Sequence, residues 1–460
     1  MSKKRTPKNL LRHSWTWQLF SVYVMFIHRL FYKSIIVEGK ENIPESGPVI
    51  YAPNHQNALM DPMLVLHATG KQIVFLARAD IFSNNILSSF LRWLKILPVY
   101  RIRDGKKNLN KNEDSFDMIS EVLEHKLPVG IFPEAAHSNK RRLLNLKKGI
   151  PRIAFLCEER NNFELGVKIV PVGIYYSKYN TFRAIAHIRF GKPIIASDYK
   201  EIYEDNDQKG IIALRDKIYE ELQPLVIDIR NLELYDIYES LRALYVKQLI
   251  KKFQLGKLSQ INKFRADKIT INALDSFAKS EPEKMSELSL KVLQYNELKD
   301  KYKVSNQSIE KPKLNLFRLL ISSLLILVIS PIFIYGLINN IIAYLIPKLL
   351  VTKIKDMQFH SSIKFVWGIF VIPIVYIIQF FVFKAIFHSW IWSLIYLLSL
   401  PISGFAAQAW FEWITIVLQD WKKFRIKNLY PADYNKLKGL HNYIVEKLDI
   451  IVSNSKIKIG

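Results

Sequence analysis

Short apolar runs alternate with helical patterns from the start of the chain to about residue 200. The apolar runs cover residues 49–53, 73–77, 128–132, 168–176 and 185–190, and a shorter run opens at Val99. Helical periodicity falls between them, at residues 115–125 and 149–159. Strands that alternate with helices predict an α/β fold with a mixed, mostly parallel sheet covered by helices.

The pattern changes after this region. Residues 205–310 are charged and favour helix, with an amphipathic stripe at residues 233–244, which indicates a helical connector. Long apolar stretches follow at residues 316–337, 365–383 and 390–418, while residues 338–350 extend the first or form a shorter segment. About 20 apolar residues suffice for a helix to cross a hydrocarbon core of about 30 Å. We therefore predict three or four transmembrane helices at the C-terminal end.

Residues 14–36 are rich in aromatic side chains but contain His28, Arg29 and Lys33. Aromatic and basic residues at helical spacing favour a segment that lies in the membrane interface without crossing it. A short helix that covers the core is the alternative.

The composition indicates an anionic partner. The chain has 460 residues, a formal net charge of +25 and 50% hydrophobic residues. Nucleic acid phosphates and anionic lipid headgroups both attract such a charge. The sequence has no zinc-ligand spacing and no RNA-recognition signature, and it has long apolar stretches, so we expect lipid and no nucleic acid. A generally lysine-rich composition is the alternative explanation. The single cysteine, Cys157, excludes a disulfide framework within the chain.

The candidate chemistry begins at His55, which ends an apolar run, with Asp61 six positions later. Histidine titrates near neutral pH, and a carboxylate behind it fixes the tautomer and stabilises the imidazolium. The pair is the minimum equipment for deprotonating a hydroxyl. Taken alone, a loop histidine beside a helix-capping aspartate explains it equally well.

Four sequence blocks follow one another in order: His55 with Asp61, residues 97–103 around Arg101, residues 132–135 around Glu134, and residues 169–173 around Pro171. In this order the blocks resemble the glycerolipid acyltransferases of the lysophospholipid acyltransferase superfamily. The chain has five residues between the histidine and the aspartate, where four are usual in this family. This version looks more like the branch that acylates glycerol-3-phosphate and dihydroxyacetone phosphate. The third block has Ala135 where glycine is usual, and His137 near a frequent arginine.

The resemblance implies roles for these residues. His55 would take the proton of an acceptor hydroxyl that attacks a thioester, with Asp61 holding the imidazole. Arg101 and Arg103 would bind the acceptor phosphate, because a guanidinium matches phosphate geometry. Further substrate contacts are expected from Glu134, Lys147 and Lys148, and Pro171 would help to shape the acyl channel. The alternatives are a structural carboxylate for Glu134, a solvated basic face for Lys147 and Lys148, and a core strand for Pro171.

The leading interpretation is an integral-membrane O-acyltransferase that uses acyl-CoA or acyl-carrier protein and glycerol-3-phosphate. Lysophosphatidate is the alternative acceptor, and a catalytically dead membrane scaffold is a third possibility. We expect no metal and no cofactor beyond the acyl donor. The basic residues that follow Trp421 favour a cytoplasmic tail, and we expect the catalytic domain on the cytoplasmic side as well.

The expected division of the chain has five parts. They are an interfacial segment at residues 1–40, a catalytic domain at 41–230, a helical connector at 231–313, transmembrane helices at 314–422, and a basic tail at 423–460. In this division all of the predicted chemistry lies before residue 313.

Overall fold

The computed structural model describes residues 14–99, 111–311 and 315–455. The chain divides into two compact units. The first is Met1–Asp228 together with Ile354–Phe365, and the second is Ile229–Lys353 together with Val366–Gly460. A segment between the predicted membrane stretches therefore belongs to the first unit.

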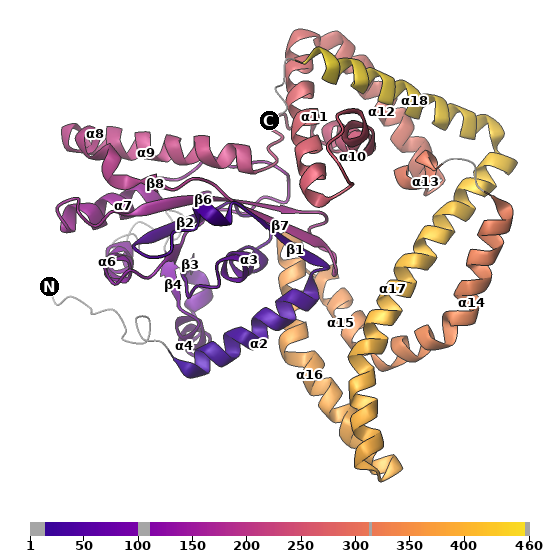
Figure 1. The fold of residues 1–460 in the computed structure, drawn as a ribbon, viewed down its shortest axis with the longest axis horizontal. Helices are drawn as coiled ribbons and strands as arrows, with labels where there is room; N and C mark the ends of the chain where they lie inside the picture. Colours follow the sequence, from indigo (N-terminus) through magenta and orange to yellow (C-terminus); the bar gives the residue numbers. More distant parts are fainter. Residues whose placement is uncertain (1–13, 100–110, 312–314, 456–460) are drawn as a thin grey trace. The chain divides into compact units, whose positions relative to one another are not determined.

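The first unit is built on an eight-stranded sheet with the order β1-β7-β6-β2-β5-β3-β4, and β8 pairs with β6 (Figure 1). Pairs are parallel except for β6 with β7 and β6 with β8. The predicted fold class is thereby confirmed. The strands are β1 (Ser34–Glu38), β2 (Val49–Pro53), β3 (Val74–Arg78), β4 (Ile96–Val99), β5 (Val129–Gly130), β6 (Lys168–Tyr176), β7 (Ile185–Phe190) and β8 (Ile194–Ile195).

Two strands depart from the predicted pattern for local reasons. β5 keeps only two residues of the predicted run, because the chain leaves the sheet towards the third block. β1 was predicted as part of the interfacial segment, but it pairs with β7 at the edge of the sheet. Its half-buried residues give little alternation to find in the sequence.

Helices cover the sheet. α6 (Lys111–Glu124), α7 (Gly149–Arg160) and α9 (Asp207–Leu222) contribute buried side chains such as Ile119, Ile153 and Leu214 to the core that also contains the strands. α3 (Met60–Thr69) packs against β7 and against α2 (Trp15–Phe31). The remaining helical pieces of this unit are α4 (Asn85–Trp93), α8 (Lys200–Asp205), η1 (Lys40–Asn42), η2 (Ala79–Phe82), η4 (Ala196–Tyr199), η5 (Gln223–Leu225) and η6 (Met357–Phe359).

One face of α2 is apolar and exposed. Trp15, Leu19, Val22 and Phe26 recur at helical spacing and are each more than half exposed. Phe20 of α2 lies 5.2 Å from the ring of Trp93 at the end of α4, and α4 itself exposes Ile86, Leu87 and Phe90. The two helices thus present neighbouring apolar side chains to the surroundings.

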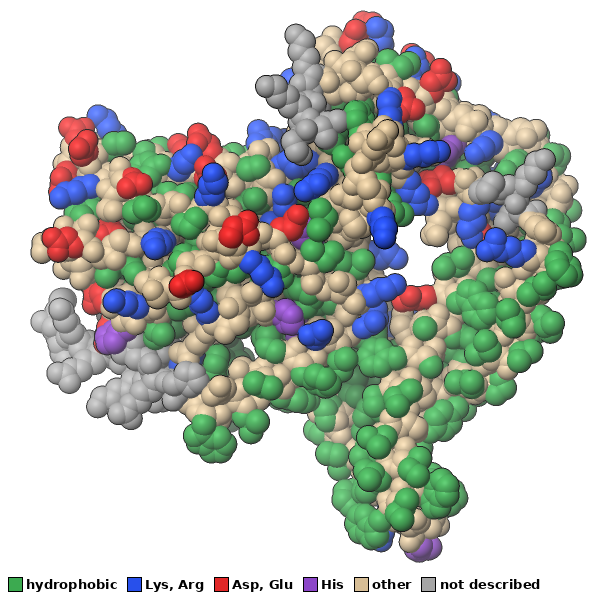
Figure 2. All heavy atoms as spheres, viewed as in Figure 1, with side chains coloured by type: hydrophobic (Ala, Val, Ile, Leu, Met, Phe, Trp, Pro, Cys, Tyr) green, Lys and Arg blue, Asp and Glu red, His purple; other side chains and the backbone are tan. Residues whose placement is uncertain are grey.

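The second unit contains the long apolar helices. Those long and apolar enough to cross a membrane are Leu316–Asn339 (α14), Met357–Phe387, which includes α16 (His360–Phe387), and Trp390–Leu429 (α17). α15 (Ile341–Thr352) is shorter. Figure 2 shows apolar side chains over these helices. They confirm the predicted apolar region, and by length and composition they can cross a membrane.

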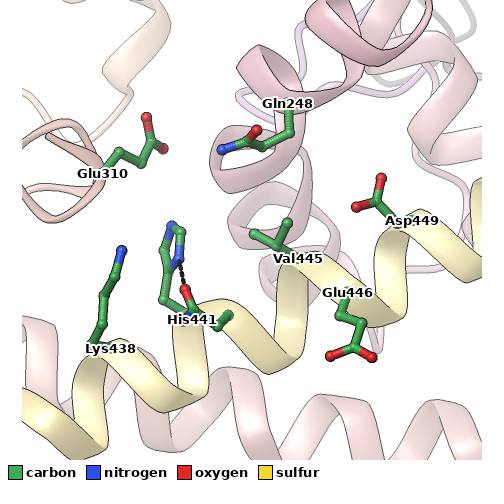
Figure 3. A pocket seen from close by; sticks show the side chains of 8 residues that line it. Gln248, Glu310, Lys438, His441, Val445, Glu446 and Asp449 are labelled. Atoms are coloured by element: carbon green, nitrogen blue, oxygen red, sulfur yellow. Dashed lines mark hydrogen bonds between the residues drawn. The ribbon is translucent and has the colours of Figure 1, made fainter. Parts of the chain in front are cut away.

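The rest of this unit is a helical cluster of α10 (Tyr235–Lys252), α11 (Gln260–Ser280), α12 (Pro282–Lys301), α13 (Asn306–Glu310) and α18 (Pro431–Asn454). α18 packs against α10, α11 and α12, so the predicted connector and the predicted tail fold together. A cavity of about 310 Å³ lies among them, where His441 of α18 and Glu310 of α13 are two of the lining residues (Figure 3). None of the residues in the four blocks lines it.

Candidate active site

The first block lies in the loop that follows β2, near the middle of the sheet. His55 comes two residues after the strand ends at Pro53, and Asp61 lies in the first turn of α3. The Nδ1 atom of His55 is 2.8 Å from Oδ2 of Asp61. The structure therefore brings the two predicted residues together, and it gives the histidine the partner that the chemistry requires.

Asp61 is fully buried and accepts hydrogen bonds on both oxygens. Oδ2 accepts the backbone N–H groups of Gln56, at 2.8 Å, and Asn57, at 2.7 Å, in addition to His55. Oδ1 accepts the hydroxyl of Tyr176 at 2.6 Å. Burial and the charge of Asp61 raise the pKa of Tyr176, which keeps this donor protonated. Four hydrogen-bond donors and the N-terminal end of α3 thus surround this carboxylate.

An ionised Asp61 can only accept, so the proton of a neutral His55 lies on Nδ1. The other nitrogen, Nε2, then carries the lone pair, and it makes no hydrogen bond to any residue that the structure describes. The side chain is 13% exposed. Nε2 is consequently the atom available to take a proton from a bound hydroxyl.

Two rings, one in the third block and one just after it, contact the imidazole of His55. Phe132 is stacked on it with ring centroids 3.8 Å apart, and His137 lies at 3.9 Å with a tilt of 48°. On the far side of His137, the ring of Phe359 lies at 5.6 Å in an edge-on arrangement. The orientation of His55 is thus defined by ring contacts as well as by Asp61.

Glu134 connects the third block to the first. Its Oε1 accepts the backbone N–H of His55 at 2.8 Å, and Oε2 accepts that of Leu144 at 2.9 Å. Burial raises the pKa of Glu134 to about 8, against the lowering effect of these two donors. The side chain is 1% exposed. This geometry favours the alternative of a structural carboxylate, which holds the loop of His55 in place, over direct contact with an acceptor.

The residue after Glu134 is in an unusual conformation. Ala135 has φ of +52°, in the left-handed region that favours glycine. The chain therefore keeps the turn that glycine usually makes in this block, but with a side chain that strains it.

The other predicted contacts are placed differently. Arg101 and Arg103 lie outside the described residues, in the segment between β4 and α6. Lys147 is exposed, and Lys148 donates from Nζ to the side chain of Gln208 at 3.2 Å. Pro171 is buried in β6 opposite Ala52 of β2, which is the environment of a core strand residue.

Sequence reasoning missed the tyrosines at the end of β6. Besides Tyr176, Tyr179 donates its hydroxyl to Oε1 of Gln56 at 2.6 Å. Arg141, part of a basic run that follows the third block, is buried between them: it donates to the carbonyl of Tyr176 at 3.2 Å, and its guanidinium carbon lies 4.9 Å from the ring of Tyr179. The signal available was the group of tyrosines at positions 175, 176 and 179, at the end of the fourth block's strand and just after it.

A histidine–aspartate pair with an available Nε2 at the end of a central strand can deprotonate a bound hydroxyl. Residues 34–175, which contain every part of this site except Phe359 and Tyr176–Tyr179, match the Acyltransferase family model. The match confirms, for this part of the chain, the resemblance predicted from the four blocks.

The chain is similar to two proteins of Saccharomyces cerevisiae. Glycerol-3-phosphate O-acyltransferase 1 is 27% identical over 203 residues, which are 44% of this chain and 26% of that protein. Glycerol-3-phosphate O-acyltransferase 2 is 27% identical over 236 residues, 50% of this chain and 31% of that protein. The chain therefore matches less than a third of the length of each. Among solved structures, the 1-acyl-sn-glycerophosphate (LPA) acyltransferase of Thermotoga maritima matches 45% of this chain and 78% of that one, with 20% identity and a TM-score of 0.34.

Proposed function

We propose that the chain transfers a fatty acyl group from an acyl thioester, either acyl-CoA or acyl-carrier protein, to a hydroxyl of glycerol-3-phosphate. The observation that carries this proposal is the His55–Asp61 pair with its available Nε2. The choice of acceptor is supported by the names of the two yeast relatives.

The reaction follows from the geometry. Nε2 of His55 takes the proton of the acceptor hydroxyl while its oxygen attacks the thioester carbonyl carbon. Asp61, 2.8 Å from Nδ1, stabilises the imidazolium that forms. The carbon–sulfur bond then breaks, and the departing thiolate receives the proton from the imidazolium. The acceptor alcohol is itself the nucleophile, so the protein needs no nucleophilic serine or cysteine.

Cationic side chains are proposed to hold the acceptor phosphate. Arg101 and Arg103 follow β4, a strand that lies in the same parallel part of the sheet as β2 and β5. The carboxyl ends of parallel strands lie at one edge of the sheet, so Val99, the last residue of β4, lies at the same edge as the end of β2 that precedes His55. Lys147 and Lys148 remain candidates for a phosphate of the donor.

Lysophosphatidate is a second candidate acceptor, and the apolar face of α2 favours it. Trp15, Leu19 and Phe26 are 75%, 66% and 59% exposed. An exposed stripe of this kind lies in the headgroup region of a bilayer, where lysophosphatidate also resides. The net charge of +25 adds attraction to anionic lipid.

We propose that the catalytic domain faces the cytoplasm. The predicted tail and connector pack together, since Asp449 of α18 pairs with Lys252 of α10 at 3.0 Å and Asp433 pairs with Lys301 of α12 at 2.9 Å. Both therefore lie on one side of the membrane. The basic residues that follow Trp421 favour the cytoplasmic side for this cluster.

Acyl transfer is tested with the purified full-length chain in liposomes that contain anionic lipid. Glycerol-3-phosphate and lysophosphatidate are offered side by side, each with acyl-CoA and with acyl-carrier protein. We expect transfer to glycerol-3-phosphate, and the His55→Ala variant gives the background. Transfer to lysophosphatidate alone would establish the second candidate, and transfer to neither would refute the proposed function.

A further inference from the structure

We propose that Ile354–Phe365, here called the return segment, is a working part of the active site, in which Phe359 and Ser362 position His55 and its loop. The sequence division assigned these residues to the transmembrane region, whereas the structure groups them with the catalytic unit. The kinetic effects predicted below rest on the proposed acyl transfer. The place of the return segment in the catalytic unit can be tested without measuring any activity.

Ring contacts connect the return segment to the proposed base. Phe359 contacts the ring of His137, with centroids 5.6 Å apart, and His137 contacts the ring of His55 at 3.9 Å. The imidazole of His55 is also stacked against the ring of Phe132. Phe359 thus supports one end of a row of rings that contains the imidazole.

Hydrogen bonds connect the same segment to the loop between His55 and Asp61. The backbone N–H of Leu59 donates to Oγ of Ser362 at 3.1 Å. The hydroxyl of Ser361 donates to the carbonyl of Tyr179 at 2.6 Å, and the side-chain amide of Asn57 donates to that carbonyl at 3.0 Å. These bonds hold the turn that places Asp61 behind the imidazole.

The segment is also anchored directly after these contacts, at Lys364 and Phe365. Nζ of Lys364 donates to the carbonyl of Asn180 at 2.7 Å. Phe365 is 1% exposed and packs edge-on against His28 and Phe31 of α2, at 5.6 and 5.7 Å. Buried aromatic contacts and three hydrogen bonds, from or to Ser361, Ser362 and Lys364, make this a built interface within the catalytic unit rather than a loop that passes over it.

A consequence for membrane topology follows. The chain leaves the catalytic unit before α14 and rejoins it at the return segment. If α14 enters the membrane from the side of the catalytic unit, the chain must therefore return to that same side by the end of α15. α16 continues from the return segment, and its residues Val366 to Phe387 rise about 33 Å at about 1.5 Å per residue, still enough for a crossing. α17 then brings the chain back to α18.

Topology is tested by labelling single cysteines with a membrane-impermeant maleimide in sealed vesicles of known orientation. Lys355→Cys, in the return segment, and Glu164→Cys, in the catalytic domain, replace exposed residues. The native Cys157 is buried, and burial raises its pKa to about 11, so the parent chain serves as the unlabelled control. We expect both cysteines to react from the same side. Labelling from opposite sides would overturn the proposal, whatever the substrate proves to be.

The positioning role is tested by steady-state kinetics with the best acceptor found. Phe359→Ala is expected to lower kcat by roughly 10- to 100-fold, because small displacements of a catalytic group are costly, while KM for the thioester stays within about twofold. Phe359→Tyr, which keeps the ring, should restore most of the rate. Met357→Ala is the matched control, since Met357 belongs to the same short helix and is 49% exposed. A folded Phe359→Ala variant with normal kcat would refute the role of the ring.

A second pair of variants keeps the test decisive if Phe359→Ala fails to fold. Ser362→Ala removes the acceptor of the Leu59 N–H and should lower kcat several-fold, whereas Ser362→Thr keeps a hydroxyl and should retain the rate. Equal rates for both would refute the positioning role. Absence of any acyl transfer in the parent chain would instead count against the proposed function, and the labelling result would still decide the place of the segment.

Discussion

Asp61→Asn is the sharpest perturbation of the proposed mechanism, because it removes a charge while keeping the shape of the side chain. The asparagine oxygen can still accept the three N–H donors that now reach Oδ2. Its amide group would then face the hydroxyl of Tyr176, which must turn from donor to acceptor. The fold of the loop should therefore survive, and the loss should fall mainly on the stabilisation of the imidazolium.

The size of the effect follows from the distance. Two unit charges at the 2.8 Å between Nδ1 and Oδ2 interact by about 6 kcal/mol at an effective dielectric constant of about 20. The asparagine dipole keeps part of this, so we expect kcat to fall by roughly 10³- to 10⁴-fold. KM values should change little, because neither substrate is proposed to contact Asp61.

The assay compares initial rates of acyl transfer in liposomes for the parent chain, Asp61→Asn and Tyr176→Phe. The last variant removes one donor to Asp61 but keeps the charge, so its kcat should stay within about tenfold of the parent. A folded Asp61→Asn variant that keeps more than a tenth of the parent kcat would refute the assignment of Asp61 as the partner of the imidazolium.

Other predictions concern neighbouring residues. His55→Ala should lower kcat by about 10² or more in the same assay, and near-normal turnover would remove it from the mechanism. Arg101→Lys should mainly raise KM for the phosphorylated acceptor, because a point charge replaces a guanidinium fork; a change in donor KM alone would show misassignment. Ala135→Gly should relieve about 1 kcal/mol of strain and raise the thermal midpoint by about 2 to 4 °C, and a lower midpoint would contradict the strain. The raised pKa of Glu134 means that its contribution to stability is complete below about pH 4.5 and is lost as pH rises towards 8; thermal midpoints across this range should show the parent losing stability relative to Glu134→Gln.

The sequence predicted most of the catalytic fold because its strands are continuous apolar runs. β2, β6 and β7 have the bounds that the pattern indicates, and His55 and Asp61 are close in sequence, so their pairing needs only a local turn. The role of Glu134 could not be predicted in this way, because the residue type does not show whether a glutamate is buried in the structure or faces the substrate. Its partners, the N–H groups of His55 and Leu144, are backbone atoms and leave no signal in the sequence.

The return segment was missed for a related reason. Its contacts join residues about 180 to 300 positions apart, such as Ser361 with Tyr179 and Ser362 with Leu59. Hydropathy assigned the segment to the membrane region because an apolar stretch follows it directly. Periodicity describes which face of an element is buried, but it does not state which distant part of the chain covers that face.

The packing of α18 on the connector also constrains the order of events during synthesis. Tyr245 of α10 donates its hydroxyl to Asp449 of α18, 204 residues later in the chain. At about 5 to 20 residues per second, the ribosome needs roughly 10 to 40 s to make the residues between them. During that time, the apolar surfaces of α10, α11 and α12 that α18 later covers are exposed. α18 can reach these surfaces only when the intervening helices have returned the chain to the same side of the membrane. Packing of α18 on the cluster is therefore limited to correctly inserted chains. In chains that are inserted incorrectly, the uncovered apolar surface stays accessible to chaperones and proteases.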